Sequence, residues 1–117
     1  MLTVESQLRE EGVWVVSVAG RLTIGAEGQR VETVTGQLFR EGARCVVIDL
    51  AGVTHLDSTG IGYLVAAMNH AMGAGGQMPM AAATAKIREA FRLTRLDSVF
   101  QFFDTVDAAI AASREQQ

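Results

Sequence analysis

The sequence predicts an α/β fold with a mixed central sheet of four to five strands packed against about four helices. Residues 45–50 form an almost unbroken apolar run, which is typical of a strand buried on both faces. Apolar residues then recur from Ile61 to Met72 with the period of an amphipathic helix. Two alternating stretches open the chain and indicate a hairpin, so we expect the sheet to be mixed rather than purely parallel.

The composition is that of a globular domain. The chain has 117 residues, 49% hydrophobic and 20% charged, which is enough for one domain over residues 1–117. The net charge of −3 argues against a nucleic-acid partner. Cys45 is the one cysteine, so a disulfide framework is excluded. The sequence shows no signal peptide and no apolar run long enough to span a membrane, and we therefore expect a cytoplasmic protein without a membrane partner.

The first half of the chain reads as two strands followed by a helix. Residues 2–8 alternate with Leu2, Val4 and Leu8 inward, and residues 13–19 form the second strand. Gly20 is expected to end that strand, with a loop or very short strand over residues 21–25. Residues 26–41 predict a helix that stops at Gly42. The residues expected on the inner faces of the second strand and this helix are Trp14, Val16, Val18, Val31, Val34 and Leu38.

The centre of the chain combines a strand, a turn and a helix. The buried strand is expected to end near Leu50, followed by a polar turn over residues 51–57. The helix then begins at Asp57, Ser58 and Thr59, three residue types that cap helices well. Its inner face is expected to carry Ile61, Leu64, Val65, Met68 and Met72.

The last third of the chain predicts two short strands and two helices. Residues 78–83 and 100–103 are the strands, with Pro79 at a strand start or edge. Thr84 caps a helix over residues 85–95, and Asp104 caps the final one. Residues 113–117 are expected to fray. The inner faces of the two helices are expected to carry Ile87, Ala90, Phe91, Thr94, Val106, Ala109 and Ile110.

The start of the central helix can accommodate a phosphate. A helix N-terminus leaves backbone N–H groups unpaired and carries a partial positive charge. A phosphate on Ser58 would lie where those donors point and would add about −1.5 to −2 charges. Gly60 and Gly62 would keep the first turn slim, so that another protein could approach closely. The alternative interpretation is that Ser58 only caps the helix.

The segment Asp57-Ser58-Thr59-Gly60-Ile61-Gly62, behind the apolar strand that ends in Asp49-Leu50, resembles the signature of the STAS domain. The similarity is strongest to bacterial anti-sigma factor antagonists and extends over the whole chain. In that family the serine after the aspartate is phosphorylated, and it corresponds to Ser58. The family usually has an acidic residue where this chain has Thr23, which puts the charge pattern beside Ser58 in doubt.

The resemblance implies a function based on protein binding and no catalytic residue, metal or cofactor in this chain. The unphosphorylated form would bind an anti-sigma factor that is also a serine kinase, and a sigma factor would be released. The kinase would phosphorylate Ser58 with its own ATP and magnesium, and a serine phosphatase would reverse the step. The alternative is a constitutive STAS adaptor in a signalling or transport assembly. The expected partner surface comprises Arg21, Leu22, Thr23, Ile24, Gly25, Leu56, Asp57, Thr59, Gly60 and Tyr63.

Other chemistries have weaker support in the sequence. His55, His70 and Asp57 near Ser58 suggest a hydrolase triad, but Leu56 stands where a nucleophile elbow needs glycine. Asp49 and Asp57 are two carboxylates close in sequence, which is compatible with a magnesium site. The favoured interpretation is that Asp49 ends its strand by accepting hydrogen bonds from loop amides. The helix over residues 85–95 carries Lys86, Arg88, Arg92 and Arg95, which is either a solvated face or a contact surface for an acidic partner.

Overall fold

A computed structural model describes residues 1–115 and confirms the α/β class: five strands form one mixed sheet in the order β1-β2-β3-β4-β5, and four helices pack against it. β1 is antiparallel to β2, and the remaining neighbours are parallel. The strands are β1 (Leu2–Glu10), β2 (Val13–Leu22), β3 (Cys45–Leu56), β4 (Met80–Ala81) and β5 (Phe102–Phe103). The helices are α1 (Ala26–Arg40), α2 (Ser58–Gly73), α3 (Ala85–Leu93) and α4 (Val106–Glu115).

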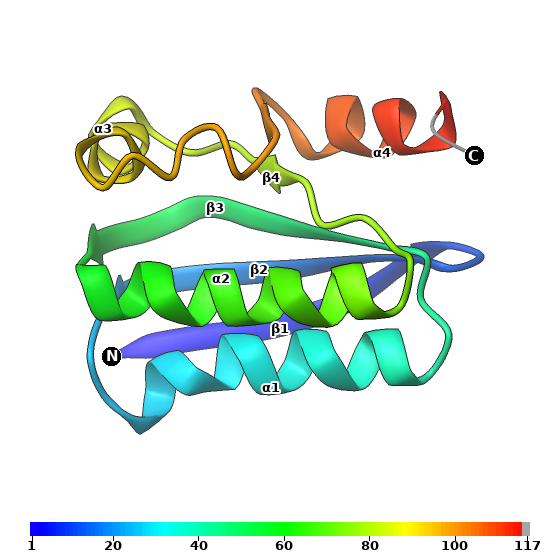
Figure 1. The fold of residues 1–117 in the computed structure, drawn as a ribbon, viewed down its shortest axis with the longest axis horizontal. Coiled ribbons are helices and arrows are strands. Elements are labelled where there is room, and N and C mark those ends of the chain that lie inside the picture. Colours follow the sequence, from blue (N-terminus) through cyan, green and yellow to red (C-terminus); the bar gives the residue numbers. More distant parts are fainter. Residues whose placement is uncertain (116–117) are drawn as a thin grey trace.

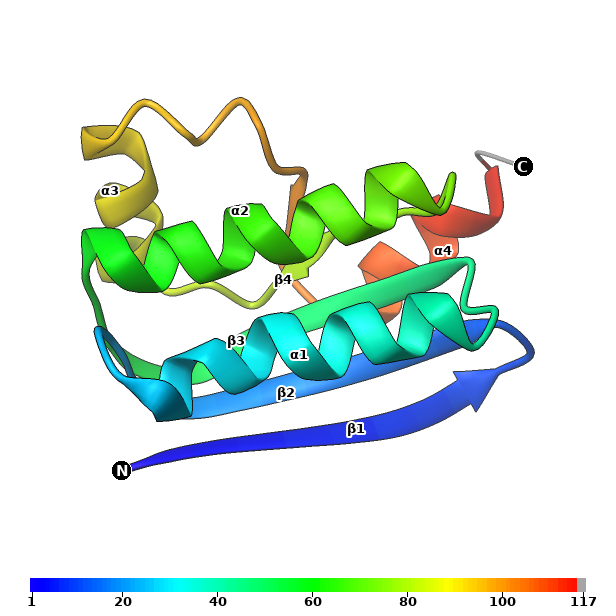
Figure 2. The ribbon, with the colours of Figure 1, turned by 60° about the horizontal axis from the view of Figure 1, so that its bottom comes forward.

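The helices are divided between the two faces of the sheet. Helices α1 and α2 lie side by side over one face, and α4 lies on the other (Figures 1 and 2). Helix α3 lies at the end of the molecule where β2 and β3 finish, together with the β2–α1 loop and the β3–α2 junction (Figure 1). Within the described residues, no helix has the length and apolar character needed to cross a membrane.

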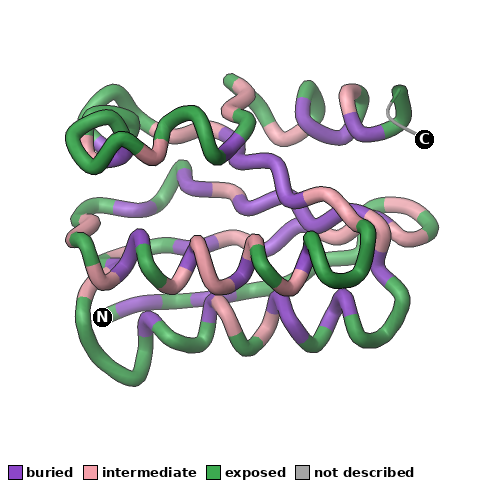
Figure 3. Tube along the Cα trace, in the orientation of Figure 1, coloured by how far each residue is buried: buried purple, intermediate pink, exposed green. Residues whose placement is uncertain are grey.

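Both faces of the central strands are buried, which explains the unbroken apolar run in β3 (Figure 3). Val46, Ile48 and Leu50 belong to the larger core beneath α1 and α2. Cys45 and Val47 belong to a smaller core beneath α4. Burial raises the pKa of the Cys45 thiol, which therefore packs in this core as a small hydrophobic side chain.

The predicted ends of two strands were wrong. β2 continues past Gly20 to Leu22, and β3 continues past Leu50 to Leu56, so the expected polar turn at residues 51–57 is mostly strand. The two extensions pair with each other in parallel, with Arg21 opposite His55 and Leu22 opposite Leu56. Because the extended residues of β3 are largely exposed, their polar sequence resembles a turn, and only the pairing with β2 defines them as strand.

Some predicted inner faces were also wrong. Leu8 is 54% exposed and Met72 is 69% exposed, because β1 and the C-terminal end of α2 extend beyond the core. The inner face of α2 instead uses the small side chains of Ala67 and Ala71, which allow α2 to lie close to its neighbours. Thr94 is exposed beyond the end of α3. The buried residues that were predicted correctly include Val16, Val18, Val31, Leu38, Ile61, Leu64, Ile87, Phe91, Ala109 and Ile110.

The C-terminal third differs from the prediction in detail. β4 is only two residues long, and Pro79 immediately precedes it. The cap of α4 is Thr105, whose hydroxyl oxygen accepts a hydrogen bond from the Ala108 amide, rather than Asp104. Residues 113–115 are helical and Ser113 is buried, so the expected fraying does not begin there. The rest of the predicted tail, residues 116–117, lies outside the described residues.

Candidate functional site

The candidate site lies where the parallel strands β2 and β3 end. In open α/β sheets, ligands commonly bind outside the carboxyl ends of the strands. Three segments meet at this end: the β2–α1 loop over residues 23–25, the junction from Leu56 to Ser58, and the first turn of α3 (Figure 1). The sequence stretch that matches the family signature therefore lies at the position where such a fold usually binds its ligand.

Asp57 holds this end of the molecule together. One carboxylate oxygen accepts a hydrogen bond from the Gly60 amide at 2.7 Å, which caps α2, and the other accepts one from the Ile24 amide at 3.0 Å. These amides, the one of Gly60 above all, hold the pKa of Asp57 below its ordinary value. A single carboxylate therefore fixes the start of α2 and the β2–α1 loop at once.

Tyr63 fixes the same loop from the second turn of α2. Its hydroxyl donates to the Gly25 carbonyl oxygen at 3.0 Å and lies 3.4 Å from the Gly25 amide nitrogen. Gly28 makes the approach possible, because a Cβ there would lie 2.7 Å from the Tyr63 ring and 2.7 Å from the Thr23 carbonyl oxygen. The sequence alone does not indicate this role of Gly28, because its partner Tyr63 lies 35 positions further along the chain.

The two glycines of the first turn of α2 have different roles. A Cβ on Gly60 would lie 2.0 Å from the Leu22 carbonyl oxygen, so Gly60 is needed for α2 to pack against the end of β2. Gly62 faces open space and is exposed. The expectation that both glycines admit another protein is therefore wrong for Gly60, which is buried against its own chain.

Ser58 is the first residue of α2 and is exposed. Because Asp57 is the cap, the interpretation that Ser58 serves only as the capping residue is wrong. Within residues 1–115, no side chain or backbone group holds the Ser58 hydroxyl by a hydrogen bond. The neighbouring Thr59 is partly buried. Of the two adjacent hydroxyls, the one on Ser58 is the more accessible.

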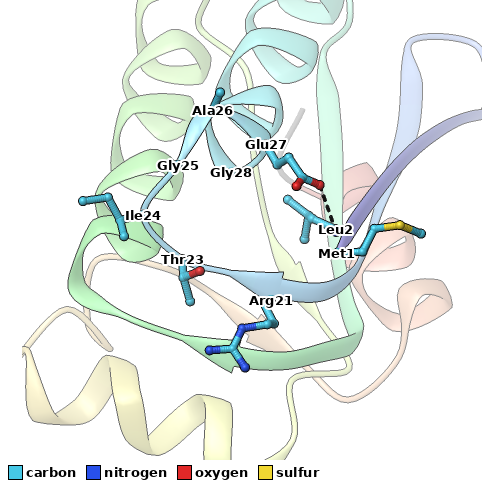
Figure 4. Close-up of a pocket in the computed structure, with 9 residues that line it drawn as sticks. All are labelled: Met1, Leu2, Arg21, Thr23, Ile24, Gly25, Ala26, Glu27 and Gly28. Carbon is cyan, nitrogen blue, oxygen red and sulfur yellow. Dashed lines mark hydrogen bonds between the residues drawn. The ribbon is translucent and has the colours of Figure 1, made fainter.

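The predicted surface residues are brought together, but they differ in exposure. Leu22 is fully buried, so it supports the surface from beneath. Ile24 is 77% exposed and points outward at the tip of its loop (Figure 4). Beside it a pocket of about 330 Å³ extends to Met1 and Leu2, where the Leu2 amide donates to the Glu27 carboxylate at 3.2 Å. Thr23, Leu56, Asp57, Thr59 and Tyr63 are partly buried, and Arg21 and Gly25 are exposed.

A second depression, of about 400 Å³, lies on the other side of Ile24. It is lined by Arg21, Thr23, Ile24, His55, Leu56, Asp57 and Lys86. Arg21 and, to a lesser extent, Lys86 lower the pKa of His55 by electrostatic repulsion, together with partial burial. From the sequence, Lys86 was predicted as part of a basic helix and His55 only as a triad candidate. Their convergence with Arg21 depends on the strand register and on the placement of α3.

The rival chemistries are not supported by the geometry. His70 lies twelve residues beyond Ser58 on α2, roughly 18 Å along the helix axis, and contacts Glu32 at 3.3 Å instead. Asp49 lies in the middle of β3, roughly 25 Å from Asp57, and accepts from the Ala51 amide at 3.0 Å without ending the strand. In the described part of the chain, no group of three or more His, Cys, Asp or Glu side chains is arranged to hold a metal ion.

Comparison with known proteins identifies the fold and the family. An anti-sigma factor antagonist from Mycobacterium paratuberculosis is 30% identical, with a TM-score of 0.81 over 97% of this chain and 95% of its own. The Bacillus cell fate determinant SpoIIAA in its phosphorylated form is 15% identical, with a TM-score of 0.72 over 94% and 98%. A sulfate transporter family protein from Wolinella succinogenes is 15% identical, with a TM-score of 0.79 over 92% and 89%. The family model described as the STAS domain matches residues 7–109, and the chain belongs to the STAS domain family.

Proposed function

We propose that this chain is an anti-sigma factor antagonist whose binding activity is controlled by phosphorylation of Ser58. The unphosphorylated form binds an anti-sigma factor that is also a serine kinase, and the sigma factor is released. The kinase ends this binding by transferring a phosphoryl group from ATP to the Ser58 hydroxyl, and a serine phosphatase removes it. The chain acts by binding and carries no catalytic residue of its own. The similarity to an anti-sigma factor antagonist over nearly the whole chain supports this proposal.

One observation carries the proposal: Asp57 caps α2, and the Ser58 hydroxyl is left exposed. A serine that capped the helix would lose a stabilising hydrogen bond on phosphorylation. Here the capping bond belongs to the neighbouring carboxylate, so Ser58 can be modified and restored without unfolding the first turn. Such separation of the cap from the modified hydroxyl is what a reversible switch requires.

The surface around Ser58 suits a protein partner. Ile24 supplies an exposed apolar side chain, and its loop is held rigid by the bonds from Asp57 and Tyr63. A rigid apolar contact loses little entropy on binding and is therefore an effective anchor. We assign partner contact to Arg21, Thr23, Ile24, Gly25, Leu56, Thr59 and Tyr63, with Leu22, Asp57 and Gly60 as supports beneath them.

A constitutive STAS adaptor is the second candidate. The same fold occurs in a sulfate transporter family protein, so the fold does not distinguish a switch from an adaptor. Phosphorylation does distinguish them. The chain is incubated with ATP and candidate anti-sigma serine kinases from the same cells, and its intact mass and phosphopeptides are measured.

The switch predicts one added phosphoryl group, located on Ser58 and not on Thr59. Ser58→Ala is expected to remain unmodified and to keep binding the kinase, whereas Thr59→Ala is modified as the wild type is. Phosphate on Thr59 would overturn the assignment of Ser58 as the modified residue. A partner that binds stably while no kinase modifies the chain would favour the adaptor.

A further inference from the structure

Three basic side chains from three different elements meet in the depression beside Ser58. Arg21 lies at the end of β2, His55 lies opposite it near the end of β3, and Lys86 lies in the first turn of α3. Lys86 is held over the strand end, since its Nζ atom donates to the Thr54 carbonyl oxygen at 2.9 Å. Arg21 points to the opposite side of β2 from Glu27 and Leu2 (Figure 4). The three side chains thus share one small surface although they are far apart in sequence.

The positive charge in this depression is not neutralised. Within residues 1–115, neither Arg21 nor Lys86 forms an ion pair with a carboxylate. Asp57 is the one acidic residue in the lining, and its two oxygens already accept backbone amides. With His55 neutral, the charges of Arg21, Lys86 and Asp57 give the depression a net charge of about +1. Protonation of His55 would raise this net charge to about +2, which is equal and opposite to the charge of a phosphate dianion.

The depression borders the position at which the proposed function places the phosphate. Leu56 and Asp57 line it, and Ser58 is the next residue, with its Cα about 3.8 Å from that of Asp57. Arginine and lysine side chains are long and carry several donors, so Lys86 can keep its bond to Thr54 and still donate to a phosphate oxygen. A phosphate attached to Ser58 would therefore be carried by the residue next to a depression whose Arg21 and Lys86 form no ion pair among residues 1–115.

We propose that the depression is an intramolecular receptor for the phosphoryl group on Ser58, with Arg21, His55 and Lys86 as the groups that bind it. This inference rests on the proposed function in assuming that Ser58 is modified. Phosphorylation then does two things at once. It adds negative charge at the start of α2, and it occupies the cations that the unphosphorylated protein presents to an acidic group of its partner. The phosphate also stabilises protonated His55, which links the phosphorylated state to pH.

The test uses chain made with phosphoserine placed at position 58 during synthesis, so no kinase is needed. The pKa of each histidine is measured by NMR in the unmodified and the phosphorylated protein. In the unmodified protein the charged groups that line the depression with His55 are Arg21, Lys86 and Asp57, the Thr54 hydroxyl oxygen lies 2.9 Å from the His55 Nδ1 atom, and the pKa of His55 is lowered, mainly by Arg21. We expect phosphorylation to raise that pKa by roughly one unit or more. His70, which contacts Glu32 between α1 and α2, is outside the depression, and its NMR signals serve as the internal control.

Matched variants identify the groups responsible. Arg21→Ala and Lys86→Ala in the phosphoprotein should raise the second pKa of the phosphate, followed by ³¹P NMR, because each removes a cation. Arg30→Ala, an exposed arginine on α1, should leave it unchanged. Inorganic phosphate, added to the unmodified chain at the same concentration as the protein, should not change the pKa of His55. Circular dichroism checks that every variant is folded.

An unchanged His55 pKa, or a phosphate pKa that does not respond to Arg21→Ala and Lys86→Ala, would overturn the proposal. A shift of His55 produced equally by free phosphate would also overturn it, because the depression would then be a site for a free anion. These outcomes differ from failure of the proposed function, in which no kinase modifies Ser58 while the synthetic phosphoprotein can still show the receptor.

Discussion

Charged residues form ion pairs at one end of the central sheet, whereas at the other end two cations have no carboxylate partner within residues 1–115. At the end beside the β1–β2 turn, Glu10 accepts from Arg114 at 3.2 Å and lies 3.5 Å from Arg44, while Arg9 lies 2.8 Å from Asp107. These contacts tie the hairpin to α4 and neutralise the charges of Arg9 and Glu10. At the end beside Ser58, Arg21 and Lys86 have no carboxylate partner among the described residues.

The carboxylates at the two ends show the same contrast. The pKa values of Glu10 and Asp57 are both lowered, but by different neighbours: Arg114 for Glu10, and backbone amides, above all that of Gly60, for Asp57. An ion pair neutralises the charge of a cation, whereas a hydrogen bond from a backbone amide leaves the nearby cations unpaired. The Ser58 end is therefore held in place by hydrogen bonds that leave its positive charges and the apolar Ile24 exposed, which is the arrangement expected of a surface that binds something else.

A negative charge at Ser58 should have the largest effect. We expect Ser58→Asp to fold, because an acidic residue in the first turn suits the helix dipole. It should weaken binding to the anti-sigma kinase by about one to two orders of magnitude, since a charge buried without a partner from the other protein costs several kcal/mol and each 1.4 kcal/mol is tenfold in affinity. True phosphorylation should weaken binding further.

Calorimetric titration measures this effect, with Ser98→Asp as the control. Ser98 is exposed in the loop after α3 and is not among the residues assigned to the partner surface. Its replacement adds the same charge and should leave the affinity unchanged. Equal affinities for wild type, phosphoprotein and Ser58→Asp would mean that the Ser58 end is not the binding surface.

Two glycines near the start of α2 test how tightly this end is packed. Gly60→Ala places a Cβ against the Leu22 carbonyl oxygen and should destabilise the fold by about 1–3 kcal/mol. Gly62→Ala faces open space and should stabilise it by about 1 kcal/mol, the helix-propensity difference. Urea unfolding of the two variants compares the same substitution two residues apart. Equal free energies of unfolding would contradict the close contact of α2 with β2.

These glycines also show what the sequence could and could not predict. The buried strand, the helical period and the signature around Ser58 are local patterns, and they were enough to predict the mixed sheet, the helices and the family. The separate roles of Gly60 and Gly62, the long end of β3 and the contact of Gly28 with Tyr63 depend on segments far apart in the chain. The cationic depression depends on strand register and on the placement of α3, neither of which has a local signal.

Removal of the Asp57 carboxylate should have an intermediate effect. Asp57→Ala loses the cap of α2 and should cost about 0.5–2 kcal/mol, whereas Asp57→Asn keeps a capping oxygen and should cost less. The folded-state pKa of Asp57 is lowered, so its contribution is present above the unfolded value near 3.9 and is lost as the pH falls through the folded value. The stability gap between wild type and Asp57→Ala, measured by urea unfolding from neutral to acid pH, should therefore narrow only in acid. A gap that stays constant would mean that the charge of Asp57 does not matter.

The smallest effect is expected at the opposite end. Arg114→Ala removes the hydrogen-bonded partner of Glu10, but the arginine side chain is 58% exposed, and exposed ion pairs contribute little to stability. Losing Arg114 should raise the pKa of Glu10 towards its ordinary value, because Arg114 is the main cause of its lowering. Any stability lost should appear only above the unfolded pKa of glutamate and vanish in acid.

Partner binding should be unchanged, because the variant leaves the Ser58 end intact. Titration of Glu10 by NMR, urea unfolding and calorimetric binding measure the three quantities. A loss of binding as large as that of Ser58→Asp would show that the two ends are coupled through the sheet, and that the contrast between a closed end and a binding end does not hold.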